Sequence, residues 1–323
     1  MAAPTQVISL FASESGAILV GTPEGVYLLE GGHRWRRVAA RPQTGAHQRP
    51  ELRFETFSFC RAAPRRVYAS SARNVYVSHD GGAEWREVNA PDSPMPIGAL
   101  SVSAENPDLI YLSRSNLLWR SADGGQSWER LNNPNRWSIS EIVAPPHDRL
   151  YVATTGEGVY FSPDRGETWQ PRRDGLPEGV GAEPVIGIED LTIHPGDPAR
   201  LYVVTRFYGV YRSEDGGRSW VSGNAGLPAP FLLPSPNRGI ITIAPSASEV
   251  LYLALAVPIH SHEVQHSIFR SSDGGRSWGR LAEANPRNRA ITSILADPSN
   301  PDFIYIGTDA GVITHQVKRR SNR

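Results

Sequence analysis

The sequence predicts an all-β protein, a seven-bladed β-propeller whose blades are four-stranded antiparallel sheets. Three observations lead to this prediction. A short apolar β segment, usually with a central Tyr, recurs seven times; the copies follow one another at about 40 to 53 residues; and Gly and Pro are scattered evenly between them. This period is typical of a propeller blade. A small sheet with two apolar faces cannot bury both alone, so we expect the units to pack on one another and close a ring.

The seven copies account for the whole chain, which we expect to form one domain over residues 1–317 with a loose tail over 318–323. The copies begin at Ile18, Val67, Ile110, Leu150, Leu201, Leu251 and Ile304. The corresponding units cover approximately residues 6–40, 54–90, 97–132, 137–176, 185–227, 239–284 and 291–317.

Each unit is expected to contain four strands, named a to d from the innermost to the outermost. An apolar run precedes each copy and forms strand a, the copy itself is strand b, and a turn leads to strand c. A Gly-rich hairpin then leads to a strand d that begins with Trp in most units. Little chain remains for a fourth strand in the seventh unit. We therefore expect either three strands there or completion of the blade by N-terminal residues.

The hairpin between strands c and d carries the most specific motif. It reads Ser78-His79-Asp80-Gly81-Gly82-Ala83-Glu84-Trp85 in the second unit and recurs in the next four, with the Ser, Asp, Gly and Trp at the same spacing. An Asp carboxylate accepts hydrogen bonds from turn N–H groups, and Gly adopts positive φ. The Ser hydroxyl adds a local bond, and the Trp is expected to pack between sheets.

This motif resembles the Asp-box, or BNR, repeat of sialidase-like β-propellers. The resemblance implies that the boxes stabilise the blades and lie away from the binding site. The box residues with this implied structural role are Asp80, Asp123, Asp164, Asp215 and Asp273. The Arg-Ile-Pro sequence of sialidases is absent, so their catalytic residues are not carried over. Over most of its length the chain is also similar to seven-bladed photosystem II stability/assembly factor-like proteins, which are non-enzymatic and hold a protein partner.

Composition excludes several classes of protein. Lys+Arg and Asp+Glu both number 33, so the chain lacks the basic excess of a nucleic-acid binder. The single cysteine, Cys60, excludes a disulfide framework and a CxxC zinc site. The longest apolar stretch is too short to span a membrane, and the N-terminus lacks the pattern of a signal peptide. We therefore expect a cytoplasmic monomer, with an exported mature form as the alternative.

The connections of a meander divide between the two ends of the ring axis. The b–c and d–a connections share one end, and the d–a connections are long and irregular, so we expect binding at this loop-rich end. Arg residues recur there and predict contact with an anionic small molecule, a glycan or an acidic protein surface. The alternative is that they stack on aromatic side chains. They are Arg53, Arg73, Arg114, Arg136, Arg206, Arg238 and Arg289.

An expanded b–c connection in the sixth unit contains His260, His262 and His266, which would share one side of a β segment. Imidazole suits divalent transition metals, so a metal on this loop is one hypothesis and a solvated polar loop is the other. No other cofactor is expected.

Acidic residues of the innermost strands are the candidates for catalysis. Two carboxylates about 5 Å or about 6.5–9.5 Å apart would allow glycoside hydrolysis. Glu189 and Asp190 are adjacent and would face opposite ways on a regular strand. The candidates are Glu55, Glu141, Glu189 and Asp190.

These features favour a binding propeller that holds an anionic ligand or a protein partner at the loop-rich end and the mouth of the channel. The alternative is an enzyme at the same place, either a sialidase-like or other glycan-active hydrolase or a metal-assisted lyase.

Overall fold

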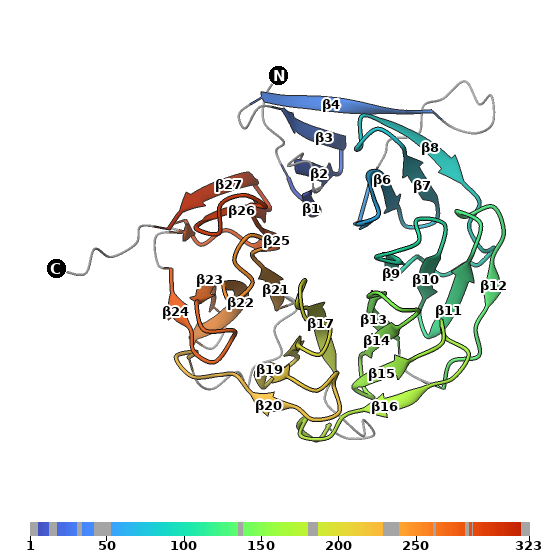
Figure 1. Cartoon of the computed structure of the whole chain (residues 1–323). Helices are drawn as coiled ribbons and strands as arrows, with labels where there is room; N and C mark the ends of the chain where they lie inside the picture. Colours follow the sequence, from blue (N-terminus) through green and yellow to red (C-terminus); the bar gives the residue numbers. More distant parts are fainter. Residues whose placement is uncertain are drawn as a thin grey trace.

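The computed structural model describes residues 6–12, 18–30, 34–41, 53–134, 138–179, 187–228, 239–260, 263–281, 284–285 and 287–317. Seven sheets stand around a central axis in the order of the chain (Figure 1). The innermost strands contact one another in sequence, and the last contacts the first, which closes the ring. The predicted seven-bladed β-propeller is therefore confirmed.

Each blade is a meander of consecutive strands, ordered from the axis outwards. Blades 1 to 3 contain β1 (Ser9–Ala12), β2 (Ile18–Thr22), β3 (Gly25–Glu30), β4 (Arg34–Arg41), β5 (Thr56–Cys60), β6 (Ala63–Ser70), β7 (Val75–Ser78), β8 (Glu84–Val88), β9 (Ala99–Val102), β10 (Ile110–Arg114), β11 (Leu117–Ser121) and β12 (Glu129–Arg130). Blades 4 to 7 contain β13 (Ile139–Val143), β14 (Leu150–Thr154), β15 (Val159–Ser162), β16 (Gln170–Arg172), β17 (Ile188–Ile193), β18 (Leu201–Thr205), β19 (Gly209–Ser213), β20 (Val221–Ser222), β21 (Ile240–Ile243), β22 (Leu251–His260), β23 (Glu263–Ser271), β24 (Gly279–Arg280), β25 (Ile291–Ala296), β26 (Phe303–Thr308) and β27 (Gly311–Gln316).

Three blades depart from the simple four-stranded meander. The outer strands β4 and β8 pair in parallel, so blades 1 and 2 share one eight-stranded sheet. Blade 7 has three strands among the described residues, β25, β26 and β27. Of the two arrangements expected for the seventh unit, the described part of the chain contains the three-stranded one.

The ring closes by packing between blades 1 and 7. The backbone N–H of Val7 donates to the carbonyl of Thr308 at 2.9 Å. Val7, Ile18 and Val20 are buried together with Tyr305 of blade 7. Each blade is built from consecutive strands, so within the described residues no strand is exchanged between the first and last blades.

The hydrophobic core is divided into clusters that lie between neighbouring blades. One cluster joins Tyr68 and Val77 of blade 2 to Leu100 and Leu112 of blade 3. Other clusters join blades 3 and 4, 5 and 6, and 6 and 7 in the same way. Burial of apolar area between sheets is thus what holds the ring together. Among the described residues, no helix has the length and apolar character needed to cross a membrane.

Five hairpins between strands c and d share one hydrogen-bond pattern, and we call them the Ser–Asp hairpins (residues 78–85, 121–128, 162–169, 213–220 and 271–278). In blade 3 the Ser121 hydroxyl donates to Asp123 Oδ1 and accepts from the N–H of Gly125, both at 2.8 Å. Asp123 Oδ1 also accepts from the Ser127 N–H at 2.9 Å. These three bonds recur in the other four hairpins.

Three of the Ser–Asp hairpins, those of blades 3, 5 and 6, also bond to the preceding blade through their Trp. In blade 2 the Trp85 indole N–H donates within its own hairpin, to the Gly82 carbonyl. The indole N–H of Trp128 donates to the carbonyl of Asn89 at 2.9 Å, and that of Trp278 donates to Gly223 at 2.7 Å. A side chain on the second hairpin Gly would collide with the preceding blade: a Cβ at Gly166 would lie 2.6 Å from Leu131 Cδ1. This Gly also has φ near 94°, a region that L residues with side chains rarely adopt.

We expect Asp123→Ala to lower the free energy of unfolding by about 1–2 kcal/mol, because the turn loses its shared acceptor. Urea denaturation followed by Trp fluorescence measures the change. Asp92→Ala is the control, since Asp92 is exposed and should alter stability by less than about 0.5 kcal/mol. Equal effects of the two substitutions would contradict this account of the hairpin.

The hairpin carboxylates predict a loss of stability in acid. The Ser127 hydroxyl, followed by N–H donors, lowers the pKa of Asp123 from 3.8 to about 2. In Asp215 and Asp273 desolvation raises the pKa, but hydrogen bonds from the turn outweigh it and lower the pKa to about 2. The folded state therefore binds fewer protons than the unfolded state in this range, so stability is complete above about pH 4 and falls as the pH drops towards 2.

Urea midpoints measured between pH 6 and pH 2.5 test this expectation. A triple variant with Asn at these three positions should start less stable and lose less on acidification than the wild type. A variant that loses as much stability as the wild type would assign the acid sensitivity to other groups.

Candidate functional site

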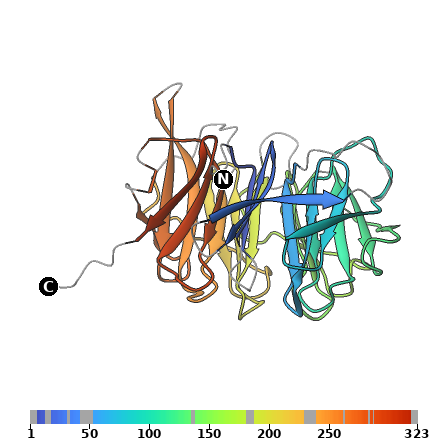
Figure 2. The same cartoon turned by 90° about the horizontal axis from the view of Figure 1, so that it is seen from above.

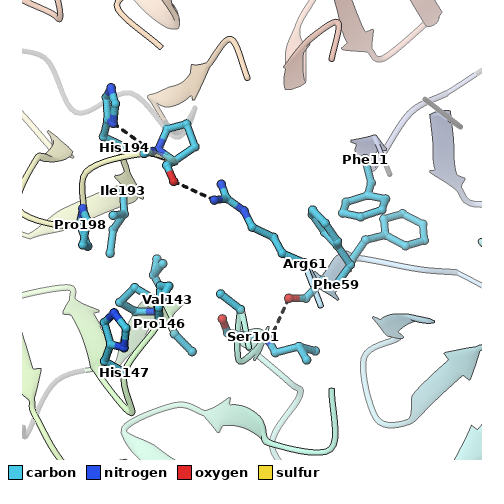
Figure 3. A pocket seen from close by; sticks show the side chains of 18 residues that line it. Phe11, Phe59, Arg61, Ser101, Val143, Pro146, His147, Ile193, His194 and Pro198 are labelled. Atoms are coloured by element: carbon cyan, nitrogen blue, oxygen red, sulfur yellow. Dashed lines mark hydrogen bonds between the residues drawn. The ribbon is translucent and has the colours of Figure 1, made fainter. Parts of the chain in front are cut away.

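A pocket of about 470 Å³ lies at the channel mouth where the innermost strands end (Figure 3). It is lined by β1, β5, β9, β13 and β17 and by the a–b connections that follow β5, β9, β13 and β17. Its size falls within the range of about 300–1,000 Å³ that is usual for small-molecule sites. This mouth is at the same end as the Ser–Asp hairpins, because those hairpins bond to the a–b connections, as Gly124 N–H does to the Asp108 carbonyl.

Arg61 extends across this mouth. It follows β5 in a tight connection in which Cys60 pairs with Ala63, whereas the a–b connections of blades 3 to 7 are longer. Its Nη1 donates to the carbonyl of Pro195 at 2.7 Å. Pro195 belongs to blade 5 and Arg61 to blade 2, so the guanidinium spans the mouth from one side to the other (Figure 3).

Three phenylalanines form the wall beside Arg61. Phe57 and Phe59 lie on the same side of β5 because side chains alternate along a strand. The ring of Phe11 on β1 stacks on Phe57 with centroids 5.8 Å apart and meets Phe59 edge-on at 5.2 Å. Between them, Ser58 faces blade 3 and accepts the Val102 N–H at 2.9 Å.

The opposite wall consists of blades 4 and 5 and is mostly apolar. Val143 and Ile193 end their strands there, and Pro145, Pro146 and Pro198 follow in the connections. No Asp or Glu is among the described residues that line the pocket.

Two histidines adjoin this wall. His194 is buried, and its Nδ1 accepts the Gly196 N–H at 3.2 Å. Desolvation, together with the charge of Arg200, lowers the pKa of His194, so this imidazole stays neutral at pH 7 and holds its own turn. His147 is exposed, and its Nδ1 lies 3.7 Å from Glu105 Oε1.

The arginines predicted to bind ligand at the loop-rich end make structural contacts where the structure describes them. Arg114 is 2% exposed, and its guanidinium donates to the carbonyls of Met95 and Arg73. Arg206 Nη2 donates to the carbonyl of Thr155 at 3.2 Å. In each case the carbonyl belongs to the preceding blade or to the connection from it.

Arg53 makes the same kind of contact: its Nε donates to the Pro23 carbonyl of blade 1 at 3.2 Å. Arg73 is exposed and Arg289 is half-buried. Arg136 and Arg238 lie outside the described residues. Contacts to carbonyls favour a role in joining blades, and ligand binding by these arginines stays a prediction.

The histidine-rich connection of blade 6 is a long hairpin of β22 and β23 that rises beyond the other blades (Figure 2). His266 is buried, and its backbone N–H donates to Asn288 Oδ1 at 2.7 Å. This b–c connection and the next d–a connection therefore lie at the same end of the ring axis. Desolvation lowers the pKa of His266. His262 and the side chain of His260 lie outside the described part. Within that part no group of three metal-ligating side chains occurs, and the predicted metal stays untested.

Two of the acidic candidates bond to the backbone of the next blade. Glu189 Oε2 accepts the Gly239 N–H at 2.7 Å, and Asp190 Oδ2 accepts the Ile241 N–H at 2.8 Å. Both carboxylates therefore turn towards blade 6, contrary to the expectation that they face opposite ways. The reason is a β-bulge between Ile188 and Asp190, which breaks the alternation.

The other two acids lie on different blades. Glu141 also sits at a bulge, and its Oε1 accepts the N–H of Ile142 at 3.2 Å. Glu55 precedes β5, and desolvation raises its pKa. Their catalytic role stays a prediction.

Sequence reasoning did not single out Arg61 or the three phenylalanines. It placed binding at the loop-rich end formed by the b–c and d–a connections, whereas this pocket lies at the opposite end of the axis and is built from a–b connections and strand ends. The available signal was local: Phe57, Phe59 and Arg61 alternate at the end of an innermost strand. The approach of Phe11 and of blades 4 and 5 had no signal in the sequence.

Comparisons with known proteins agree on the fold. A model of the Sortilin-Vps10 family (Sortilin, neurotensin receptor 3) matches residues 116–228. A probable oligoxyloglucan-reducing end-specific xyloglucanase of Neosartorya fischeri is 24% identical over 164 residues, which cover 50% of this chain and 18% of that protein. A xyloglucanase of Paenibacillus sp. is 25% identical over 257 residues, 74% of this chain and 22% of that protein. The chain thus spans about a fifth of the length of these relatives.

Two kinds of solved structure superpose on the whole chain. The GH74 enzyme of Niastella koreensis has a TM-score of 0.75 and 15% identity, with 99% of this chain and 54% of that chain covered. The structure of YCF48 bound to D1 peptide has a TM-score of 0.65 and 15% identity, with 99% and 95% covered. At this identity the likeness establishes the propeller architecture alone.

We expect Arg114→Met to lower the free energy of unfolding by about 1–3 kcal/mol, because the carbonyls of Met95 and Arg73 lose their buried donor. Arg73→Met is the matched control, since that side chain is exposed. Urea denaturation compares the two variants. A stable Arg114→Met protein would show that the buried guanidinium does not join blades 2 and 3 as described.

Proposed function

We propose that this chain is a binding propeller that holds an anionic ligand, or an acidic group of a partner protein, at the channel mouth beside Arg61. The observation that carries the proposal is the position of Arg61: a permanent cation extends across a pocket of about 470 Å³ whose described lining contains no carboxylate. A guanidinium in partly apolar surroundings favours an anionic partner, because charge-assisted hydrogen bonds are stronger than neutral ones.

Other arginines at this end of the ring have carboxylate partners. Arg66 Nη2 lies 2.7 Å from Asp108 Oδ1, and Arg120 Nη2 lies 2.7 Å from Glu167 Oε1. Both pairs join neighbouring blades. At the axis, Arg61 Nη1 donates to the carbonyl of Pro195. An incoming carboxylate or phosphate is a stronger acceptor than this carbonyl, which supports the choice of Arg61 as the anion contact.

The hydrogen bonds of two acids on the innermost strands support binding over catalysis. Glu189 and Asp190 each accept a backbone N–H from blade 6, so one oxygen of each carboxylate is engaged between blades. A general acid or nucleophile needs its oxygens directed at substrate.

The proposal is tested by ligand-observed NMR with acetate, benzoate, inorganic phosphate and the uncharged benzamide. We expect at least one anion to bind and benzamide to bind more weakly than benzoate. Arg61→Gln should weaken anion binding at least about tenfold, the usual size of a lost charged hydrogen bond.

Arg53→Gln is the control, since Arg53 lies at the other end of the channel and contacts Pro23. It should leave the binding at the mouth unchanged. If no anion binds, or if Arg61→Gln binds the anions as well as the wild type does, the proposal is wrong.

A second candidate is action on a glycan, which the similarity to xyloglucanases favours. Incubation with xyloglucan and an assay for new reducing ends tests it directly. Release of oligosaccharides that is abolished in a Glu189→Gln or Glu141→Gln variant would favour this candidate. A His-bound metal at the blade 6 hairpin would extend it to a lyase, and metal analysis of the purified protein decides that point.

A further inference from the structure

Resting on the proposed function, the further inference concerns the chemical class of the ligand. The pocket offers two very different surfaces to one molecule. At one point Arg61 supplies a guanidinium, and around it the lining is largely aromatic and aliphatic. A ligand that fits both must carry a single small anionic head and an apolar body.

The aromatic wall is organised as a unit. Phe11, Phe57 and Phe59 contact one another across blades 1 and 2, and each remains only half-buried, so their rings contribute surface to the pocket. The ring of Phe57 also contacts the buried ring of Trp85, with the two ring centroids 6.0 Å apart. The wall is therefore anchored, and an apolar group placed against it meets a preformed surface.

The wall that faces the phenylalanines is apolar as well. Val143, Pro146, Ile193 and Pro198 present aliphatic and pyrrolidine carbons, and these residues come from blades 4 and 5. A body inserted between the walls would exchange water for apolar contact on both sides. A polyanion such as inorganic phosphate would leave this lining unused and would require more donors than one guanidinium provides.

We infer that the channel mouth binds an amphiphilic monocarboxylate, with the carboxylate on Arg61 and an alkyl or aryl body between the phenylalanine wall and the proline-rich wall. In this arrangement the carboxylate takes hydrogen bonds from Arg61 in place of, or in addition to, the Pro195 carbonyl. The apolar body accounts for most of the affinity, and the head sets its orientation and charge selectivity.

A homologous series tests the inference: acetate, butanoate, hexanoate and octanoate, with octanamide as the uncharged match and inorganic phosphate as the compact anion. Isothermal titration or ligand-observed NMR gives the dissociation constants. We expect affinity to rise roughly fourfold for each added methylene until the pocket is filled. Octanamide and phosphate should each bind at least about tenfold more weakly than octanoate.

Variants of each surface separate the two contributions. Arg61→Gln should remove the preference for octanoate over octanamide, and Arg61→Lys should restore part of it. Phe59→Asn should flatten the dependence on chain length, whereas Phe59→Leu, which keeps an apolar side chain, should preserve it. Thermal melting shows whether each variant is folded, and the series on the wild type remains decisive if Phe59→Asn is not.

The outcomes distinguish this inference from the proposed function. If no anion of any kind binds, the proposed function fails and the inference fails with it. If acetate and phosphate bind as tightly as octanoate and depend on Arg61, the anion site stands and the amphiphilic ligand is overturned. If octanoate and octanamide bind equally and Arg61→Gln has no effect, the carboxylate contact is overturned.

Discussion

The structure depends on one constraint: every blade has two apolar faces, and each must be buried against a neighbour. The Ser–Asp hairpins meet this constraint at the rim of the ring, where the indole of Trp128 reaches the carbonyl of Asn89 on the preceding blade. The second hairpin Gly allows this approach, because a Cβ at Gly125 would lie 3.0 Å from Val88 Cγ2. A local turn thereby sets the distance between sheets, and repetition of that distance closes a ring.

Charged side chains also join neighbouring blades. Arginines join blades by donating to carbonyls at one end, as Arg206 does to Thr155, and by pairing with acids at the other, as Arg66 does with Asp108. A chain with zero net charge thus uses much of its charge between blades. Such pairs contribute little energy each, but they satisfy groups that would otherwise be poorly hydrated. Arg61 lies at the axis and donates to the carbonyl of Pro195 on blade 5.

The similarity to xyloglucanases and to YCF48 concerns this architecture and leaves the chemistry of the mouth open. A propeller collects the ends of its innermost strands around one axis, so different side chains at those ends can give unrelated sites on the same scaffold. In this chain the ends carry phenylalanines, prolines and one arginine. That composition favours recognition of an apolar anion, whereas carboxylates such as Glu189 are engaged by the backbone of blade 6.

The sequence by itself determined the seven units, the order of their strands and the turns with the Ser–Asp motif, because these depend on residues close together in the chain and on a repeat of fixed length. Tertiary structure alone decided the site. Phe11, Arg61 and Pro195 come from three different blades, and their meeting depends on the curvature of the ring. The burial of Arg114 and the contacts of Glu189 and Asp190 are also non-local, since each depends on the backbone of a neighbouring blade.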